Sequence, residues 1–197
     1  MQTDNQVVHT EGTVLHWAGF YDLLLKIVTL GREGRFRRRI ITTARLESGQ
    51  RVLDVGCGTG TLAVAAAEVV GTEGSVHGID PAPEMIARAR AKAEKAAASV
   101  AFEVGVIEAL AFPDQSMDVV LSSLMFHHLT DQLKPLGLAE IRRVLAPGGR
   151  LVVVDFGKPD GMVAEVKAAG FGTVTTARFG PRFLFSLIAE AGAVGSE

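Results

Sequence analysis

Cysteine, tryptophan and tyrosine each occur only once in this chain of 197 residues. The single cysteine, Cys57, excludes an intrachain disulfide and a multi-cysteine metal site. Apolar runs of membrane-spanning length are missing, and segment 1–13 lacks the apolar stretch of a signal peptide. We therefore expect a cytoplasmic protein that has no metal site and no integral membrane segment.

The chain also lacks an excess of charge of one sign. Its formal net charge is −2, whereas nucleic-acid-binding domains usually carry a basic excess. Hydrophobic residues make up 48% of the chain and charged residues 21%, which is typical of a globular protein. We expect a small-molecule partner rather than a nucleic acid, and the length fits a single domain.

What is present is a change of periodicity along the chain. Segments 15–30 and 35–46 show helical spacing of apolar residues, and from Gln50 onward strand-like runs alternate with helical patterns, which predicts a parallel α/β sheet. The expected strands are Arg51–Val55, Ser75–Asp80, Val100–Val104, Met117–Ser122 and Arg150–Phe156. The expected helices are Thr61–Val70, Pro83–Ala98, a helix capped by Thr130 or Asp131 that ends before Pro147, and Met162–Ala169, ended by Gly170.

The last two predicted strands are Val174–Phe179 and Phe183–Ala189, on either side of Gly180-Pro181. A parallel crossover needs a dozen or so residues, so two strands this close in sequence must pair in antiparallel orientation. The pattern therefore predicts one reversed strand in an otherwise parallel sheet.

A glycine-rich run, VLDVGCGTG at 52–60, passes from the first predicted strand into a helix. Glycines let the backbone approach a ligand closely, and the helix N-terminus offers free amides. Asp80 follows twenty residues after Gly60, at the end of the next strand, where a carboxylate can accept the hydroxyls of a ribose. The loop and this acid predict one site for a nucleotide-type ligand.

A nicotinamide dinucleotide site is the competing interpretation, but it requires a third glycine where this chain has Thr61. Asp54, two residues before the first glycine, would repel a pyrophosphate. The same carboxylate could orient the ammonium group of an amino acid. The pattern therefore favours a ligand that contains adenosine and an amino acid.

These motifs resemble the class I S-adenosylmethionine-dependent methyltransferases (EC 2.1.1), and within them the small-molecule group of the ubiquinone and menaquinone biosynthesis methyltransferases. The resemblance covers about residues 14–190 and includes GIDPAPEM at 78–85 and LAPGGRLVVVDF at 145–156. It implies a Rossmann-like, doubly wound sheet of seven strands, mostly parallel with the last strand antiparallel, preceded by N-terminal helices.

The resemblance also implies which residues bind S-adenosylmethionine. The glycine loop would surround the methionine part, Asp80 would bind the ribose, and Pro81 and Met85 would lie along the adenine. Ser122 or Ser123 would contact the amino group through a backbone carbonyl. Family members often read adenine with an aspartate in a Gly-Asp-Ala segment; this chain has Val106 in that place, with Glu108 or a backbone group as the substitute. The implied cofactor-binding residues are Asp54, Gly56, Cys57, Gly58, Gly60, Asp80, Pro81, Met85, Val106, Ile107, Glu108, Ser122 and Ser123.

On the acceptor side, His127 and His128 leave the fourth strand, and one of them is expected to remove a proton from the acceptor. A loop hydrogen bond or solvation is the alternative for each. Tyr21 belongs to a Tyr-Asp pair that closes over the cofactor in quinone-type relatives, although helix packing explains it equally well. Asp155 either contacts substrate or caps a turn.

We interpret residues 1–48 as a helical preface and lid, and residues 49–190 as the cofactor-binding core of a single domain, 1–197. The expected function is in-line methyl transfer to an oxygen, carbon or nitrogen of a small, apolar acceptor. A non-catalytic protein that binds S-adenosylmethionine or S-adenosylhomocysteine is the alternative. Peripheral contact with anionic headgroups through Arg32–Arg39 competes with a solvated helix face, and a homodimer is a further hypothesis.

Overall fold

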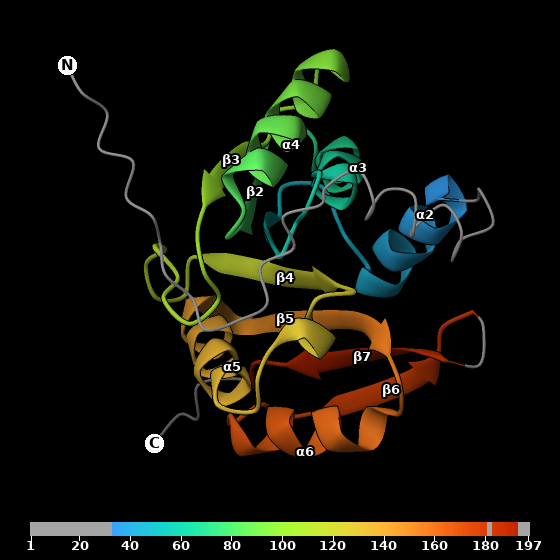
Figure 1. Ribbon diagram of the computed structural model, residues 1–197, viewed down its shortest axis with the longest axis vertical. Coiled ribbons are helices and arrows are strands. Elements are labelled where there is room, and N and C mark those ends of the chain that lie inside the picture. The colour runs from blue at the N-terminus through green and yellow to red at the C-terminus, as the bar shows by residue number, and fades with distance from the viewer. Residues whose placement is uncertain (1–32, 181–182, 193–197) are drawn as a thin grey trace.

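The computed structural model describes residues 33–180 and 183–192, and seven of its strands form one sheet in the order β3-β2-β1-β4-β5-β7-β6 (Figure 1). All neighbouring strands are parallel except that β7 runs antiparallel to both β5 and β6. The predicted seven-stranded fold with one reversed strand is therefore confirmed. The strands are β1 Arg51–Val55, β2 Ser75–Asp80, β3 Ala101–Val104, β4 Met117–Ser123, β5 Leu145–Phe156, β6 Val174–Arg178 and β7 Leu184–Glu190.

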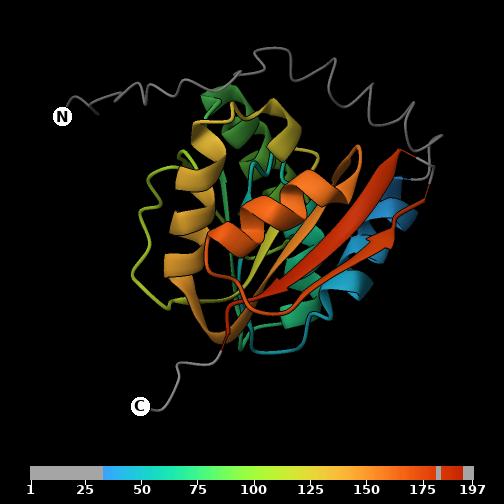
Figure 2. The same cartoon turned by 90° about the horizontal axis from the view of Figure 1, so that it is seen from below.

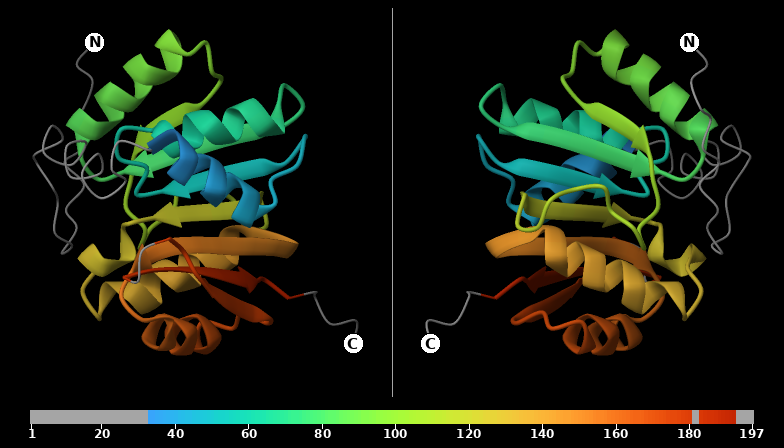
Figure 3. Two further views of the ribbon diagram at one scale, coloured as in Figure 1. Left: turned by 90° about the vertical axis from the view of Figure 1, so that its right-hand side faces the viewer. Right: turned by 90° about the vertical axis from the view of Figure 1, so that its left-hand side faces the viewer.

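Helices cover both faces of this sheet. One face carries α2, α3 and α4, and the other carries α5 and α6, as the two views of Figure 3 show from opposite sides. A short 3-10 turn, η1, follows β4. The helical elements are α2 Glu33–Ala44, α3 Thr61–Val70, α4 Pro83–Lys95, η1 Phe126–His128, α5 Leu133–Val144 and α6 Pro159–Ala168.

The central strands supply two hydrophobic cores because successive side chains of a strand point to opposite faces. On β1, Val52 packs with α2, α3 and α4, whereas Leu53 packs with α5 and α6. On β4, Leu121 joins the first core and Val120 the second, and all four side chains are fully buried. This burial on both faces explains why the strand sequences are almost continuously apolar.

Several helix boundaries differ from the predicted ones. Helix α2 spans Glu33–Ala44 rather than residues 35–46, and Arg45 after it adopts a left-handed conformation with φ of 50°. Helix α4 ends at Lys95 rather than Ala98, because Ala97 adopts a left-handed conformation with φ of 49°. Helix α6 begins at Pro159 rather than Met162, since proline suits the first helical position, where no intrahelical N–H is needed. The predicted stop of this helix at Gly170 is confirmed by a φ of 83° at that residue.

The predicted side-chain cap of α5 is wrong. The helix begins after Gln132 with no side-chain cap, and the Thr130 carbonyl accepts the backbone N–H groups of Leu133 and Lys134 at 3.1 and 3.2 Å. The Asp131 carboxylate instead accepts a hydrogen bond from the Lys134 ammonium at 3.0 Å. The Thr130 carbonyl therefore takes the place of the expected side-chain cap, and the Asp131 side chain pairs with Lys134 instead.

The reversed strand β7 lies between β5 and β6, with α6 beside the hairpin (Figure 2). Its register pairs Phe156 of β5 with Leu184 and Arg150 with Glu190. The start of β7 therefore lies beside the end of β5. Within the described ranges, no helix has the length and apolar character needed to cross a membrane.

The packing of β7 predicts a large cost for removing Leu187, whose side chain is fully buried. Leu187→Ala should destabilise the protein by about 2–5 kcal/mol, because it loses buried apolar surface and leaves a cavity. Urea unfolding followed by circular dichroism measures this. Thr176→Ala, at the exposed position paired with Leu187 on β6, is the control and should change stability by about 0.5 kcal/mol or less. Equal effects of the two substitutions would contradict the burial of β7.

Candidate functional site

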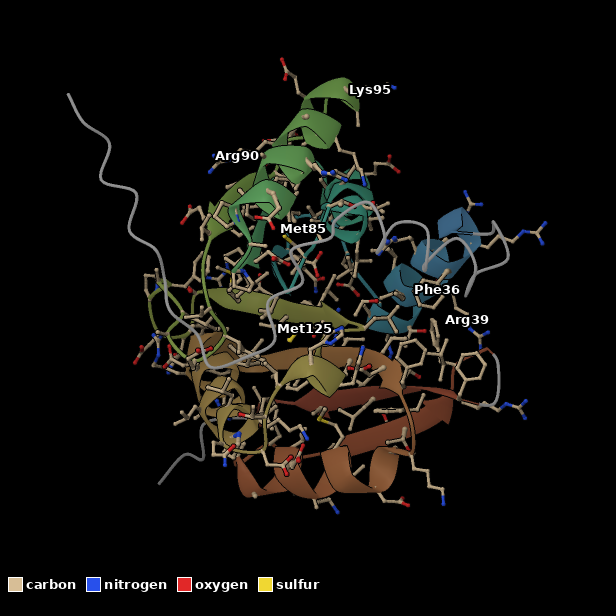
Figure 4. All side chains as sticks on the ribbon, in the orientation of Figure 1. Phe36, Arg39, Met85, Arg90, Lys95 and Met125 are labelled. Atoms are coloured by element: carbon tan, nitrogen blue, oxygen red, sulfur yellow. The ribbon has the colours of Figure 1, made fainter. Side chains whose placement is uncertain are left out.

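The loop after β1 folds tightly against its neighbours. Gly56 donates its backbone N–H to the Ile79 carbonyl at 2.9 Å. A Cβ at Gly56 would overlap the side chain of Met125, which Figure 4 labels, and a Cβ at Gly60 would lie 2.5 Å from the Phe102 ring. Both glycines also have φ near 70°, at 69° and 74°. A side chain at either position would be both strained and in collision, so the sequence needs glycine there.

Asp80, at the end of β2, holds this loop. Its carboxylate accepts the Gly58 backbone N–H at 2.9 Å and the Ala82 backbone N–H at 3.0 Å. Burial raises the pKa of Asp80 above its ordinary value, and the two amide donors oppose that shift. The structure thus brings together the glycine loop and the acid that the sequence assigned to one site.

Asp54, in β1, is a buried carboxylate with an unusual environment. Its Oδ2 atom has no hydrogen-bond partner among the described residues. Burial raises the pKa of Asp54 to about 7, while the Arg37 guanidinium and the Ala63 backbone N–H act in the opposite direction. The side chain therefore titrates near neutrality and has one oxygen available to a ligand.

Helix α2 does not present a uniformly solvated basic face. Arg35 and Arg38 are exposed, but Arg37 is half-buried and its Nε has no partner within the described part of the chain. Arg39, labelled in Figure 4, lies over the Phe179 ring at 4.7 Å. The expectation of a solvated arginine face is therefore wrong for Arg37, which acts on Asp54. Arg39 is exposed, as expected, and also packs on Phe179 beside the β6–β7 hairpin.

Two buried serines end β4 beside Asp54. The register pairs Asp54 with Leu121, one residue before Ser122. The hydroxyls of Ser122 and Ser123 are buried and, like the Asp54 oxygen, have no hydrogen-bond partner among residues 33–180 and 183–192. By the alternation along β4, Ser123 lies on the same face of the sheet as Asp54 and Ser122 lies on the opposite face, so two of these three polar atoms share one face.

The loop after β3 lies next to the end of β2, because Gly105 donates its backbone N–H to the Asp80 carbonyl at 3.2 Å. Pro81 is half-buried and Met85 is buried in the first turn of α4, on the same stretch of chain. The residues assigned to the adenine thus border the residue assigned to the ribose.

Val106 and Ile107 are both buried, at 7% and 5% exposure. Ile107 packs in the core beneath α5, where a Cβ at Gly137 would lie 2.7 Å from its side chain. The side chain of Ile107 is therefore committed to packing, and the half-buried Glu108 follows it in the same loop.

His127 forms a close pair with Asp155 at the end of β5. Its Nδ1 lies 2.6 Å from the Asp155 carboxylate, which also accepts the backbone N–H groups of His127 and Phe156 at 3.2 and 2.7 Å. The His127 side chain is 31% exposed and that of Asp155 only 2%. The sequence analysis proposed His127 as a base and gave Asp155 no definite role. Because β4 and β5 are neighbours in the sheet, the ends of these two strands could have been expected to bring the two residues together.

His128 has a different environment. Its ring is tilted by 43° against the ring of His127, with 3.9 Å between ring centroids. Partial burial lowers the pKa of His128, and the neighbouring His127 lowers it further, against an opposite effect of Asp155. The structure thus distinguishes two histidines that the sequence left equivalent.

Other sequence candidates add little to this site. Tyr21 and Arg32 lie outside the described residues. The Cys57 thiol is buried, and burial raises its pKa, so it is not a thiolate nucleophile. In the described segments, no group of three or more His, Cys, Asp or Glu residues could hold a metal ion.

Comparison with known proteins gives matches at several levels. A family model described as "Methyltransferase domain" matches residues 46–177. A demethylmenaquinone methyltransferase of Thermus thermophilus is 44% identical over 140 residues, which is 71% of this chain and 62% of that protein. A ubiquinone/menaquinone biosynthesis C-methyltransferase of Geobacter sp. (strain M21) is 36% identical over 141 residues, 71% of this chain and 59% of the relative. This chain therefore spans about three-fifths of the length of these relatives.

Among solved structures, a SAM-dependent methyltransferase from Aquifex aeolicus superposes with a TM-score of 0.71 at 24% identity, covering 79% of this chain and 89% of that one. At this level of identity the likeness concerns the fold.

The buried Asp54 predicts an unusual pH dependence of stability. An unfolded aspartate has a pKa of about 3.9, so between roughly pH 4 and pH 7 the folded state keeps a proton that the unfolded state has lost. Folding stability should therefore fall as pH rises through this window. Asp54→Asn removes the titration and should stabilise the apoprotein relative to wild type, by about 2–3 kcal/mol more at pH 8 than at pH 5.

Urea unfolding of both proteins at the two pH values measures this difference. Asp160→Asn, which changes an exposed aspartate in α6, is the control and should show the same difference from wild type at both pH values. A pH-independent effect of Asp54→Asn would contradict the assignment of a near-neutral pKa to Asp54.

Proposed function

The chain belongs to the methyltransferase-domain family, and we propose that it transfers a methyl group from S-adenosylmethionine to a small, apolar acceptor. This membership confirms the resemblance that the glycine-loop motif predicted. The observation that carries the proposal is the set of buried polar atoms without partners in the described chain, on Asp54, Ser122 and Ser123, next to a glycine loop held by Asp80.

These residues fit the proposed cofactor. The Asp54 carboxylate and the Ser123 hydroxyl, on the same face of the sheet, offer acceptors for an ammonium group. Arg37 offers positive charge near Asp54 for a carboxylate. Asp80 stands at the end of β2, where a ribose would lie, with Pro81 and Met85 beside it. We assign the aminoacyl end to β1 and β4 and the adenosine end to β2 and the loop after β3.

When bound, S-adenosylmethionine supplies a methyl group that is already activated on a sulfonium. The chain's own task is to align the two reactants and to exclude water, and alignment of this kind contributes about 7–11 kcal/mol. The tightly packed glycine loop and the buried carboxyl end of β4 suit this task. A general base would assist this reaction, but the reaction does not require one.

Aromatic side chains support an apolar acceptor. The Phe156 ring lies edge-on to His127 at 5.1 Å and is stacked with Phe183 at 5.9 Å between centroids, and Phe183 is 50% exposed. These rings extend from the reacting histidine to the surface. A planar, ring-containing acceptor such as a quinol fits them, and the relative named for demethylmenaquinone supports that class.

Two other functions fit these residues less well. A nicotinamide oxidoreductase would place a pyrophosphate near the buried Asp54 carboxylate, which would repel it. In a non-catalytic protein that binds the cofactor, Asp155 would still hold the turn after β4, but its contact with the His127 imidazole would have no chemical role. Peripheral contact of α2 with anionic lipid, a homodimer, a cytoplasmic setting and a lid formed by residues 1–48 stay predictions.

Cofactor binding tests the proposal first. Asp80→Asn should weaken the affinity for S-adenosylmethionine by about 10- to 100-fold, because hydrogen bonds to a charged acceptor contribute roughly 1.5–3 kcal/mol each. Isothermal titration calorimetry of wild type, Asp80→Asn and the exposed control Glu73→Gln measures it. Wild type and control should bind equally and should show no heat with a nicotinamide dinucleotide. Undiminished binding by Asp80→Asn would refute the assignment of the ribose site.

Turnover tests the chemistry. Methyl-labelled S-adenosylmethionine should transfer its label to a quinol such as demethylmenaquinol when wild-type protein is present, and Asp80→Asn should slow the reaction at limiting cofactor. Phenols and amines belong to the same screen, and a reaction without protein is the blank. Tight cofactor binding without label transfer to any of these acceptors would favour the non-catalytic alternative.

A further inference from the structure

The carboxylate of Asp155 does two things at the end of β5. It accepts the backbone N–H groups of His127 and Phe156, which fixes the turn after β4, and it lies 2.6 Å from Nδ1 of His127. With 2% exposure, its side chain is almost completely shielded from water. This carboxylate is therefore held rigidly by the backbone around it and can orient the imidazole.

The contact determines which nitrogen of His127 carries the proton. Both Asp155 oxygens already accept N–H donors, so the carboxylate is an acceptor toward the ring, and a separation of 2.6 Å requires a proton on Nδ1. In the neutral imidazole, Nε2 then has a free lone pair. The ring also lies between His128 and Phe156, at 3.9 and 5.1 Å, which restricts its rotation.

We propose that Asp155 is a positioning residue that makes His127, and not His128, the proton acceptor for the methyl acceptor. This inference rests on the proposed methyl transfer and adds to it. As the acceptor atom bonds to the methyl carbon, the carbon–sulfur bond breaks and its electron pair remains on sulfur. The proton of the acceptor moves to Nε2 of His127 and from there to solvent, and Asp155 stabilises the imidazolium without accepting the proton.

His128 is less suited to this role. Burial and the neighbouring ring lower its pKa, so it is a weaker base, and its contact with Asp155 is electrostatic at a distance. The groups that face His127 are Asp155 from β5 and His128 from η1. Of these, the carboxylate is the one that can stabilise a positive charge on the ring.

Two kinds of measurement test the pair. In Asp155→Asn, the side-chain amide can donate to Nδ1 and so move the ring proton to Nε2, which blocks the base. We expect kcat with demethylmenaquinol to fall on the order of 100-fold or more, while the affinity for S-adenosylmethionine stays within about twofold. Histidine 15N NMR of the full chain should show His127 protonated at Nδ1 in wild type and at Nε2 in the variant.

Three further variants make the result specific. His127→Gln should lose as much activity as Asp155→Asn, and the double variant should lose no more than either, because the two residues act as a unit. Asp160→Asn, an exposed aspartate in the first turn of α6, should behave as wild type. His128→Gln should lose less than tenfold.

The inference is overturned if Asp155→Asn keeps kcat within threefold, if His128→Gln is the more damaging histidine variant, or if wild-type His127 is protonated at Nε2. If Asp155→Asn does not fold, the wild-type NMR spectrum and His127→Gln still decide the question. If wild type binds the cofactor but methylates nothing, the proposed function fails, and the position of the ring proton in the spectrum reports separately on the pair.

Discussion

Two carboxylates at the ends of flanking strands, the buried Asp155 and the half-buried Asp80, fix the loops of the central strands. Asp80 ends β2 and accepts the Gly58 backbone N–H from the loop after β1. Asp155 ends β5 and accepts the His127 backbone N–H from the turn after β4. Because the sheet order is β2-β1-β4-β5, the two central loops are held from outside, one on each side. Everything proposed for the site depends on this arrangement.

Strands β1 and β4, which lie between Asp80 and Asp155, carry buried polar groups that lower the stability of the fold. The buried Asp54 oxygen and the hydroxyls of Ser122 and Ser123 lack partners in the described part of the chain, and an unsatisfied buried polar group costs roughly 1–3 kcal/mol. A stable core would have apolar residues at these positions. The neighbouring strands and the packed helices offset this cost, which is the arrangement expected of the proposed cofactor site.

The sequence was informative where the signal was local. Strands β1 and β2 and helix α3 have their predicted bounds because glycines and changes of period mark their ends, and the fixed spacing from loop to acid placed Gly58 and Asp80 together. The Asp155–His127 pair joins residues 28 positions apart through the order of the strands, which no local pattern encodes. The inward position of Arg37 was hidden for a similar reason: among several arginines, only the packing of α2 decides which one is buried.

The reversed strand explains why the proposed acceptor side is aromatic. In a parallel sheet, every strand ends at the edge where ligands bind, and each strand begins at the opposite edge. Because β7 runs the other way, it begins at the binding edge, where Leu184 pairs with Phe156 at the end of β5. Phe183, one residue earlier, thus reaches the Phe156 ring beside His127. A seventh strand in the parallel direction would begin at the far edge, and the apolar surface next to the proposed base would be absent.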